Sequence, residues 1–250
     1  MRTGAQPKKS DLGVRAASAV VMVTVAGTAL WLGGWVWRIF VVLLAIGVQF
    51  EWWGLVGKFG ISPRGKALWI AGGILYVGLA AAMMMVLRQA SPPMSSDAAW
   101  VLLVLSPVIA TDVGAYFTGR SIGGPKIAAS ISPSKTWSGL LGGAFAAAMV
   151  MVWLTIRSRT PGDLVASGIP WPSVGFGIAV AVTAQVGDFF ESWMKRRAGV
   201  KDSGNLIPGH GGLFDRLDGL LAVLFVCGLV LVAAMAQSLL SGEGLLPTPT

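Results

Sequence analysis

Residues 217–240 read LDGLLAVLFVCGLVLVAAMAQSLL, an apolar run whose single charged residue, Asp218, lies near its start. A helix of about 20 apolar residues is long enough to cross the hydrocarbon core of a bilayer. The run therefore predicts a transmembrane helix, and the expected fold is an all-α polytopic membrane protein with about seven such helices. The other apolar runs lie at roughly residues 14–33, 35–56, 67–87, 98–118, 138–156 and 172–193.

The composition agrees with a chain that resides in lipid. Hydrophobic residues make up 54% of the 250 residues and charged residues 12%, which excludes an ordinary water-soluble domain. The net charge of +8 comes from Lys and Arg that lie mostly between the apolar runs. We interpret it as a topology signal and expect no nucleic-acid binding. The single cysteine, Cys227, excludes an internal disulfide and a cysteine-based metal site.

The basic residues also predict the orientation. With a cytosolic N-terminus, the spans leave Arg38, Arg88, Arg157 and Arg159 outside and the remaining Lys and Arg inside. Short cytosolic loops of membrane proteins carry this excess of positive charge. We therefore expect an integral protein of a bacterial inner (plasma) membrane, with its N-terminus and its active site on the cytosolic side.

The expected organisation has a tail at each end and two groups of helices between them. Residues 1–11 are polar and basic, and we expect them to be retained and not cleaved as a signal peptide. Gly33 and Gly34 separate the first two runs, which predicts an antiparallel hairpin, and the Gly- and Ala-rich residues 142–148 predict close helix packing. The parts are a cytosolic basic tail (1–13), about three N-terminal transmembrane helices (14–97), a catalytic transmembrane domain (98–240) with cytosolic catalytic loops at 119–136 and 195–216, and a C-terminal tail (241–250).

Four polar side chains lie near the end of the run at 172–193. Asp188, Glu191, Ser192 and Lys195 are spaced at i, i+3, i+4 and i+7, so they are predicted to share one helix face. Ionisable groups in a membrane are costly unless they are paired, and they indicate function by default. The two carboxylates form a candidate cation site. The alternative is that Glu191 and Lys195 form an ordinary i,i+4 ion pair.

A basic loop that bears glycines follows this helix. Glycines let backbone N–H groups approach phosphate oxygens, and neighbouring Lys and Arg side chains neutralise the remaining charge. The loop therefore predicts phosphate binding, although a basic run at a helix end is also typical of a topology signal. Its members are Lys195, Arg196, Arg197, Lys201, Asp202, Gly209, His210, Gly211 and Gly212.

A second acidic pair opens the last span. Asp215 and Asp218 lie three residues apart, flank Arg216, and are expected to face the first pair. Four carboxylates with hard oxygen donors suit Mg²⁺, with a second metal ion left open, whereas zinc lacks an adequate ligand set. The alternative for Asp215 and Asp218 is helix capping and compensation of the helix dipole.

Two residues keep alternative roles. His210 is the only histidine, but a phosphate nucleophile with a second pKa of about 6 is already anionic near neutral pH and does not require a general base. His210 is therefore as well explained by a hydrogen bond to phosphate or within the turn. Asp112, inside the run at 98–118, is either a further metal ligand or the partner of a loop cation.

The chain resembles the phosphatidate cytidylyltransferases, also called CDP-diacylglycerol synthases, over roughly residues 112–218. It departs from their pattern at Ser138, where the family often has Glu, and at Gly219, where it often has Ser. The resemblance in the upstream block is carried by Asp112, Ala115, Tyr116, Phe117, Gly119, Arg120, Ser132, Pro133, Lys135, Thr136, Trp137 and Gly139. In the downstream block it is carried by Ser192, Lys195, Arg196, Lys201, Asp202, Gly204, Pro208, His210, Gly211, Gly212, Asp215, Arg216 and Asp218.

The resemblance implies transfer of CMP from CTP to phosphatidate in phospholipid biosynthesis, which releases pyrophosphate and leaves CDP-diacylglycerol in the membrane. It also implies a homodimer as one form of assembly. Asp188, Glu191, Asp215 and Asp218 would hold metal and act in catalysis together with Lys201. Substrate would be bound by Ser132, Lys135, Thr136, Ser192, Lys195, Arg196, Asp202, Gly209, His210, Gly211, Gly212 and Arg216.

Two other functions compete with this interpretation. A CTP-dependent lipid kinase of the polyprenol type shares the nucleotide and the membrane setting, but it would release CDP in place of pyrophosphate. A membrane transporter would also place carboxylates such as Glu51, Asp112, Asp188 and Glu191 within its spans. It would not need the glycine, histidine and Asp-Arg-x-Asp arrangement.

Overall fold

Seven α-helices make up the structure, a computed structural model that describes residues 12–89, 99–158 and 170–241. Each of the seven is long and apolar enough to cross a membrane, which confirms the predicted all-α polytopic fold. The helices are α1 (Leu12–Leu32), α2 (Gly34–Gly57), α3 (Pro63–Gln89), α4 (Ala99–Ser121), α5 (Trp137–Ser158), α7 (Trp171–Ala198) and α8 (Phe214–Ser241).

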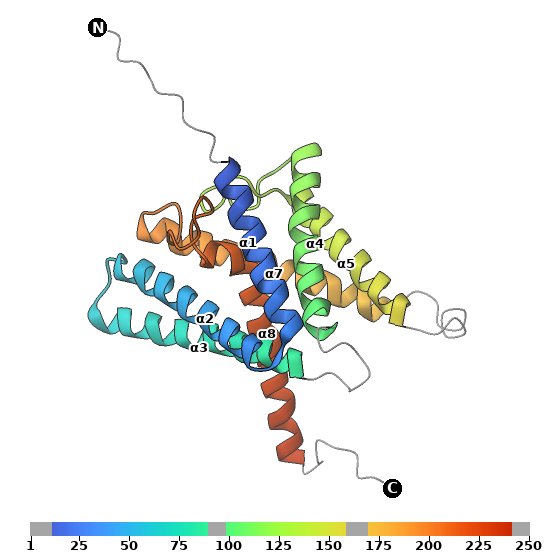
Figure 1. The fold of residues 1–250 in the computed structure, drawn as a ribbon. Helices are drawn as coiled ribbons and strands as arrows, with labels where there is room; N and C mark the ends of the chain where they lie inside the picture. The colour runs from blue at the N-terminus through green and yellow to red at the C-terminus, as the bar shows by residue number, and fades with distance from the viewer. Residues whose placement is uncertain (1–11, 90–98, 159–169, 242–250) are drawn as a thin grey trace.

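The two polar loops lie at the end of the bundle where α1 begins, and α8 ends on the opposite side (Figure 1). They run over residues 122–136 and 199–213. They are shorter than the predicted 119–136 and 195–216 because α4 and α7 extend beyond their apolar runs and α8 begins before its own. In α7, Lys195, Arg196 and Arg197 form the last turn, where cations favour the helix dipole. Gly199 then ends the helix with a left-handed φ of 68°.

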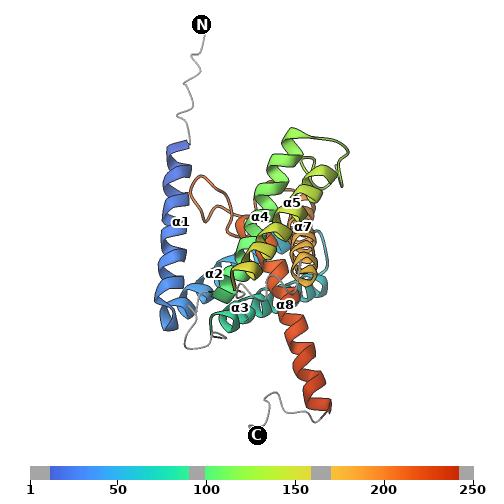
Figure 2. The same cartoon turned by 90° about the vertical axis from the view of Figure 1, so that its right-hand side faces the viewer.

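Helices α1 and α2 do not form the predicted antiparallel hairpin. Gly33 and Gly34 make a tight turn with φ values of 63° and 52°, but α2 then lies along α3 while α1 stands apart from the rest of the bundle (Figures 1 and 2). The reason lies in α2, whose buried side chains Trp37 and Val48 contribute to the core that it forms with α3 and α8.

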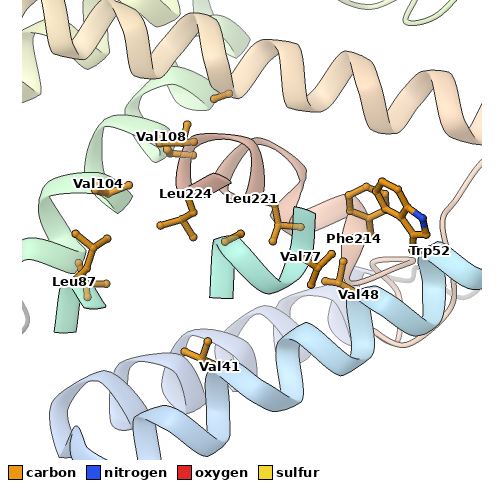
Figure 3. Packing of buried hydrophobic residues seen from close by; sticks show 14 of the residues in the cluster. Val41, Val48, Trp52, Val77, Leu87, Val104, Val108, Phe214, Leu221 and Leu224 are labelled. Atoms are coloured by element: carbon orange, nitrogen blue, oxygen red, sulfur yellow. The ribbon is translucent and has the colours of Figure 1, made fainter. Parts of the chain in front are cut away.

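The apolar core gathers where α2, α3, α4 and α8 meet (Figure 3). Trp52 of α2 lies against Phe214 at the start of α8, with ring centroids 5.7 Å apart. The indole N–H of Trp52 also donates to the carbonyl oxygen of Trp69 in α3, at 2.9 Å. These contacts fix the first turn of α8, which carries Asp215, against the N-terminal helices.

Close packing through glycine joins α4, α5 and α7, as residues 142–148 predict. A Cβ atom on Gly143 of α5 would lie 2.7 Å from the carbonyl oxygen of Thr111 in α4, and one on Gly177 of α7 would lie 2.6 Å from the Cα atom of Ala148. Real side chains cannot come this close, so the three backbones pack at a distance that only glycine allows. The packing fixes both ends of the loop at 122–136.

We expect Gly143→Ala to lower the free energy of unfolding of the detergent-solubilised protein by about 1–3 kcal/mol, because the added methyl group overpacks the α4–α5 contact. Gly175→Ala in α7 is the matched control, since a Cβ atom there meets nothing within 4 Å. Thermal unfolding followed by circular dichroism measures both variants. Equal unfolding midpoints for the two would contradict the proposed role of this contact.

Candidate functional site

One carboxylate from each acidic pair, on α7 and on α8, forms an ion pair with the same lysine. The Lys195 Nζ atom lies 2.7 Å from Glu191 Oε2 on its own helix and 2.7 Å from Asp215 Oδ1 on α8. Glu191 is 1% exposed, so its charge depends on this ammonium group for compensation. The i,i+4 ion pair that the sequence offered as an alternative therefore exists, and it also reaches the second acidic pair.

The second carboxylate oxygen of Asp215 organises the loop at 199–213. Asp215 Oδ2 accepts hydrogen bonds from the backbone N–H groups of Ser203 and Gly212, both at 2.9 Å, and lies 3.1 Å from the Ser203 hydroxyl oxygen. Gly209 and Gly211 have φ values of 76° and 85°, which other residues rarely adopt. The glycines therefore fold the loop back onto Asp215, and the backbone N–H groups of Ser203 and Gly212 bind this carboxylate.

His210 of this loop forms hydrogen bonds with residues of α1 and α8. Its Nδ1 atom is 2.8 Å from the Ser18 hydroxyl of α1, and its carbonyl oxygen accepts hydrogen bonds from Arg216 Nε at 3.2 Å and Nη2 at 2.7 Å. The structure thus agrees with a role for His210 in the turn. These contacts also tie α1, which otherwise stands apart, to the loop (Figure 2).

The loop at 122–136 brings a second lysine to the site. The ammonium group of Lys135 forms an ion pair with Asp188 and also donates a hydrogen bond to Gln185 Oε1 at 3.2 Å. Burial lowers the pKa of Lys135 to about 8, against the opposing effect of the negative charges of Asp218 and Asp112. Asp188 therefore lies in an ion pair between α7 and this loop.

Two other predicted residues of this loop have structural contacts. The Thr136 hydroxyl accepts a hydrogen bond from the backbone N–H of Gly139 at 3.1 Å and so caps the start of α5. Ser132 is buried, and its backbone N–H donates to the carbonyl oxygen of Ala128 at 2.9 Å. The Arg196 Nε atom lies 3.3 Å from the carbonyl oxygen of Ile131, which joins the end of α7 to this loop.

A cavity of about 350 Å³ with charged side chains in its wall opens between α4, α5, α7 and the loop at 122–136. Its wall includes the carboxylates of Asp112 and Asp188 and the cations of Arg120 and Lys135. Asp112 is exposed on this wall. A cavity with both signs of charge and the Tyr116 ring in its lining suits a ligand with phosphate and ring groups.

The remaining predicted residues lie around this centre. Ser192 is half-buried on α7, while Lys201 and Asp202 are exposed on the loop at 199–213. The sequence prediction missed Glu51 of α2, whose buried carboxylate accepts a hydrogen bond from the Ser203 hydroxyl at 2.8 Å. A lone carboxylate inside an apolar run was the available signal.

The four carboxylates are near one another but are not gathered into one cage. Asp188 pairs with Lys135, Glu191 and Asp215 pair with Lys195, and Asp218 Oδ1 accepts a hydrogen bond from the Gly219 N–H at 2.9 Å. Within residues 12–89, 99–158 and 170–241, no three His, Cys, Asp or Glu side chains are close enough to hold a metal ion together. In this structure the ammonium groups of Lys135 and Lys195 supply the positive charge beside these carboxylates.

The donor set nevertheless fits a hard cation. Glu191 Oε1 is a buried oxygen that has no hydrogen-bond partner among the described residues. Such an orphaned acceptor is costly, and a cation or a ligand-bound water would satisfy it. Carboxylate oxygens are the ligands that Mg²⁺ prefers.

Comparison with known proteins shows the family to which the chain belongs. The sequence model of the Cytidylyltransferase family matches residues 66–234, which include both loops. A phosphatidate cytidylyltransferase of Brucella melitensis is 34% identical, over 85% of this chain and 90% of its own length. One of Rickettsia bellii is 31% identical, over 90% of this chain and 94% of its own length, and one of Haemophilus influenzae is 34% identical over 70% and 63%. This chain is therefore an integral membrane member of the cytidylyltransferase family.

Proposed function

We propose that the protein is a phosphatidate cytidylyltransferase, which transfers CMP from CTP to phosphatidate and releases pyrophosphate. The observation that carries the proposal is the joining of Glu191, Lys195 and Asp215 beside a glycine-bearing loop. This arrangement couples two apolar helices to the loop that the sequence predicts to bind phosphate. The names of its family relatives support the same activity.

The reaction joins two polyanions at the membrane surface. A phosphate oxygen of phosphatidate attacks the α-phosphorus of CTP, the bond from that phosphorus to the bridging oxygen of the β-phosphate breaks, and pyrophosphate leaves. The attacking oxygen is already anionic near neutral pH, because the second pKa of a phosphate monoester is about 6. Catalysis then depends on positioning and on charge stabilisation. We assign these tasks to Lys135, Lys195, Arg196, Lys201 and Arg216.

We further propose Mg²⁺ as the metal. Asp188, Glu191, Asp215 and Asp218 would hold it, with Asp112 as a candidate further ligand, and it would neutralise charge on the transferring phosphates. The unpaired Glu191 Oε1 supports this assignment. Lys135 and Lys195 would bind phosphate oxygens of the substrates.

The proposed location is a bacterial inner membrane, with both loops on the cytosolic side. The start of α1 lies at the same end of the bundle as the loops (Figure 1), and basic residues are concentrated there. CTP would then reach the site from the cytosol, while phosphatidate keeps its acyl chains between the helices and its phosphate at the surface.

The experiment that tests the function uses the purified protein with CTP, phosphatidate and Mg²⁺. We expect pyrophosphate and CDP-diacylglycerol to form at equal rates, and a chelator to stop both. Release of CDP with a phosphorylated lipid would indicate a CTP-dependent lipid kinase. Absence of any CTP turnover would refute the proposed function.

A further inference from the structure

Glu51 is a buried carboxylate in α2, outside the loops and helices that carry the predicted site. Glu51 is only 3% exposed. Oε1 accepts a hydrogen bond from the Leu213 backbone N–H at 2.9 Å, and Oε2 accepts one from the Phe214 N–H at 2.8 Å. The N–H groups at the start of a helix have no partner within that helix, so Glu51 supplies acceptors for the start of α8.

One serine connects Glu51 to Asp215. The Ser203 hydroxyl lies 2.8 Å from Glu51 Oε2 and 3.1 Å from Asp215 Oδ2, while the Asp215 backbone N–H donates to the same hydroxyl at 3.3 Å. A hydroxyl has one proton to donate and two lone pairs that accept. The Ser203 hydroxyl proton is donated to Glu51 Oε2, the nearer carboxylate oxygen, while the Ser203 backbone N–H donates to Asp215 Oδ2 at 2.9 Å. Ser203 therefore links the two residues, and the position of one depends on the position of the other.

Two glycines of the loop fit closely around the Glu51 side chain. A Cβ atom on Gly204 would overlap Glu51 Oε1, and one on Gly212 would lie 2.7 Å from Glu51 Oε2 and overlap the Ser203 hydroxyl. The backbone of the loop thus wraps the carboxylate at a distance that other residues would prevent. The sequence predicts that glycines of this loop bind phosphate. The close contact with Glu51 is a second reason why the loop requires glycine.

We infer that Glu51 is a positioning residue for catalysis. It orders the loop at 199–213 and the first turn of α8, and through Ser203 it holds Asp215 in the orientation that reaches Lys195. The catalytic part of this inference rests on the proposed function. It places a residue of the N-terminal helices in the support of the site, although those helices carry none of the predicted substrate or metal contacts.

The test variant is Glu51→Gln, which keeps the size of the side chain but presents an amide NH₂ to a set of donors. Hydrogen–deuterium exchange at the Leu213 and Phe214 amides, measured without substrate or metal, should become at least about tenfold faster as their bonds weaken. In the assay with CTP and phosphatidate, the Mg²⁺ concentration for half-maximal rate should rise about 10- to 100-fold. The turnover number should fall by about 100-fold.

The matched control is Thr155→Ala, which removes a 2.7 Å hydrogen bond between the Thr155 and Ser173 hydroxyls of α5 and α7, remote from the loops. We expect its exchange at Leu213 and Phe214 and its Mg²⁺ dependence to match wild type. A fall in the amount of folded protein alone would change neither readout.

Unchanged exchange in Glu51→Gln would overturn the inference, and so would faster exchange with wild-type Mg²⁺ dependence and turnover. Failure of the proposed function is distinguishable, because it appears in wild type as an absence of pyrophosphate release. Faster exchange together with a shifted Mg²⁺ dependence would support the positioning role.

Discussion

Asp215→Asn is expected to lower the turnover number for pyrophosphate release by at least about 1000-fold. The substitution removes the charge that faces Lys195 and replaces one acceptor oxygen with an NH₂ group. Loss of one carboxylate from the site removes several kcal/mol of charge stabilisation in the transition state, and each 1.4 kcal/mol or so changes the rate tenfold. Pyrophosphate release from CTP and phosphatidate at saturating Mg²⁺ measures the effect.

Folding must be monitored alongside activity in this experiment, because Asp215 also orders its own loop. Asn keeps one oxygen that can accept hydrogen bonds from Ser203 or Gly212, so the variant should remain folded, with an unfolding midpoint only modestly below that of wild type. A folded variant that retains more than about a tenth of the wild-type rate would refute the assignment of Asp215 to the catalytic centre.

Lys195→Met should destabilise the protein by about 3–5 kcal/mol as well as inactivate it. The Lys195 ammonium group lies between Glu191 and Asp215, and both carboxylates are largely buried. Without it, two negative charges face each other without compensation, in a region where their desolvation is costly. Thermal unfolding in detergent measures the loss of stability.

The double variant Lys195→Met/Glu191→Gln separates the two effects. Neutralising Glu191 removes one of the uncompensated charges, so we expect recovery of a substantial part of the lost stability while activity stays absent. The two substitutions are in contact and their effects should not add. Additive destabilisation would show that the ion pair of Lys195 and Glu191 does not stabilise the bundle.

The helices and the local helix faces were predictable because they depend on residues close in sequence. Each apolar run is long enough to reveal a membrane-spanning helix, and the spacing from Asp188 to Lys195 places these residues on one face. The sequence also predicted the partner of this face, since Asp215 opens the next helix after a loop whose glycines allow the chain to return to α7. The described structure brings Glu191, Lys195 and Asp215 together.

The features that the sequence did not predict depend on contacts between segments that are distant in sequence. The pattern of apolar residues gives no direction in which α2 leaves the turn at Gly33 and Gly34, because that direction depends on its packing with α3 and α8. For the same reason, Glu51 could be recognised as an unusual buried charge but not as the partner of Ser203, which lies 152 residues later. The ion pair of Asp188 with Lys135 likewise joins residues that are 53 positions apart in the sequence.

Lys135 and Lys195 act as internal counterions for the buried carboxylates, which would separate assembly of the bundle from binding of the proposed Mg²⁺. Carboxylates that enter a bilayer without compensation would oppose the packing of α7 against α8. Here the chain carries its own ammonium groups to them, so the helices can associate before any external cation arrives. In a small zinc domain the ion is required for folding itself; here the proposed Mg²⁺ would enter a bundle that has already assembled.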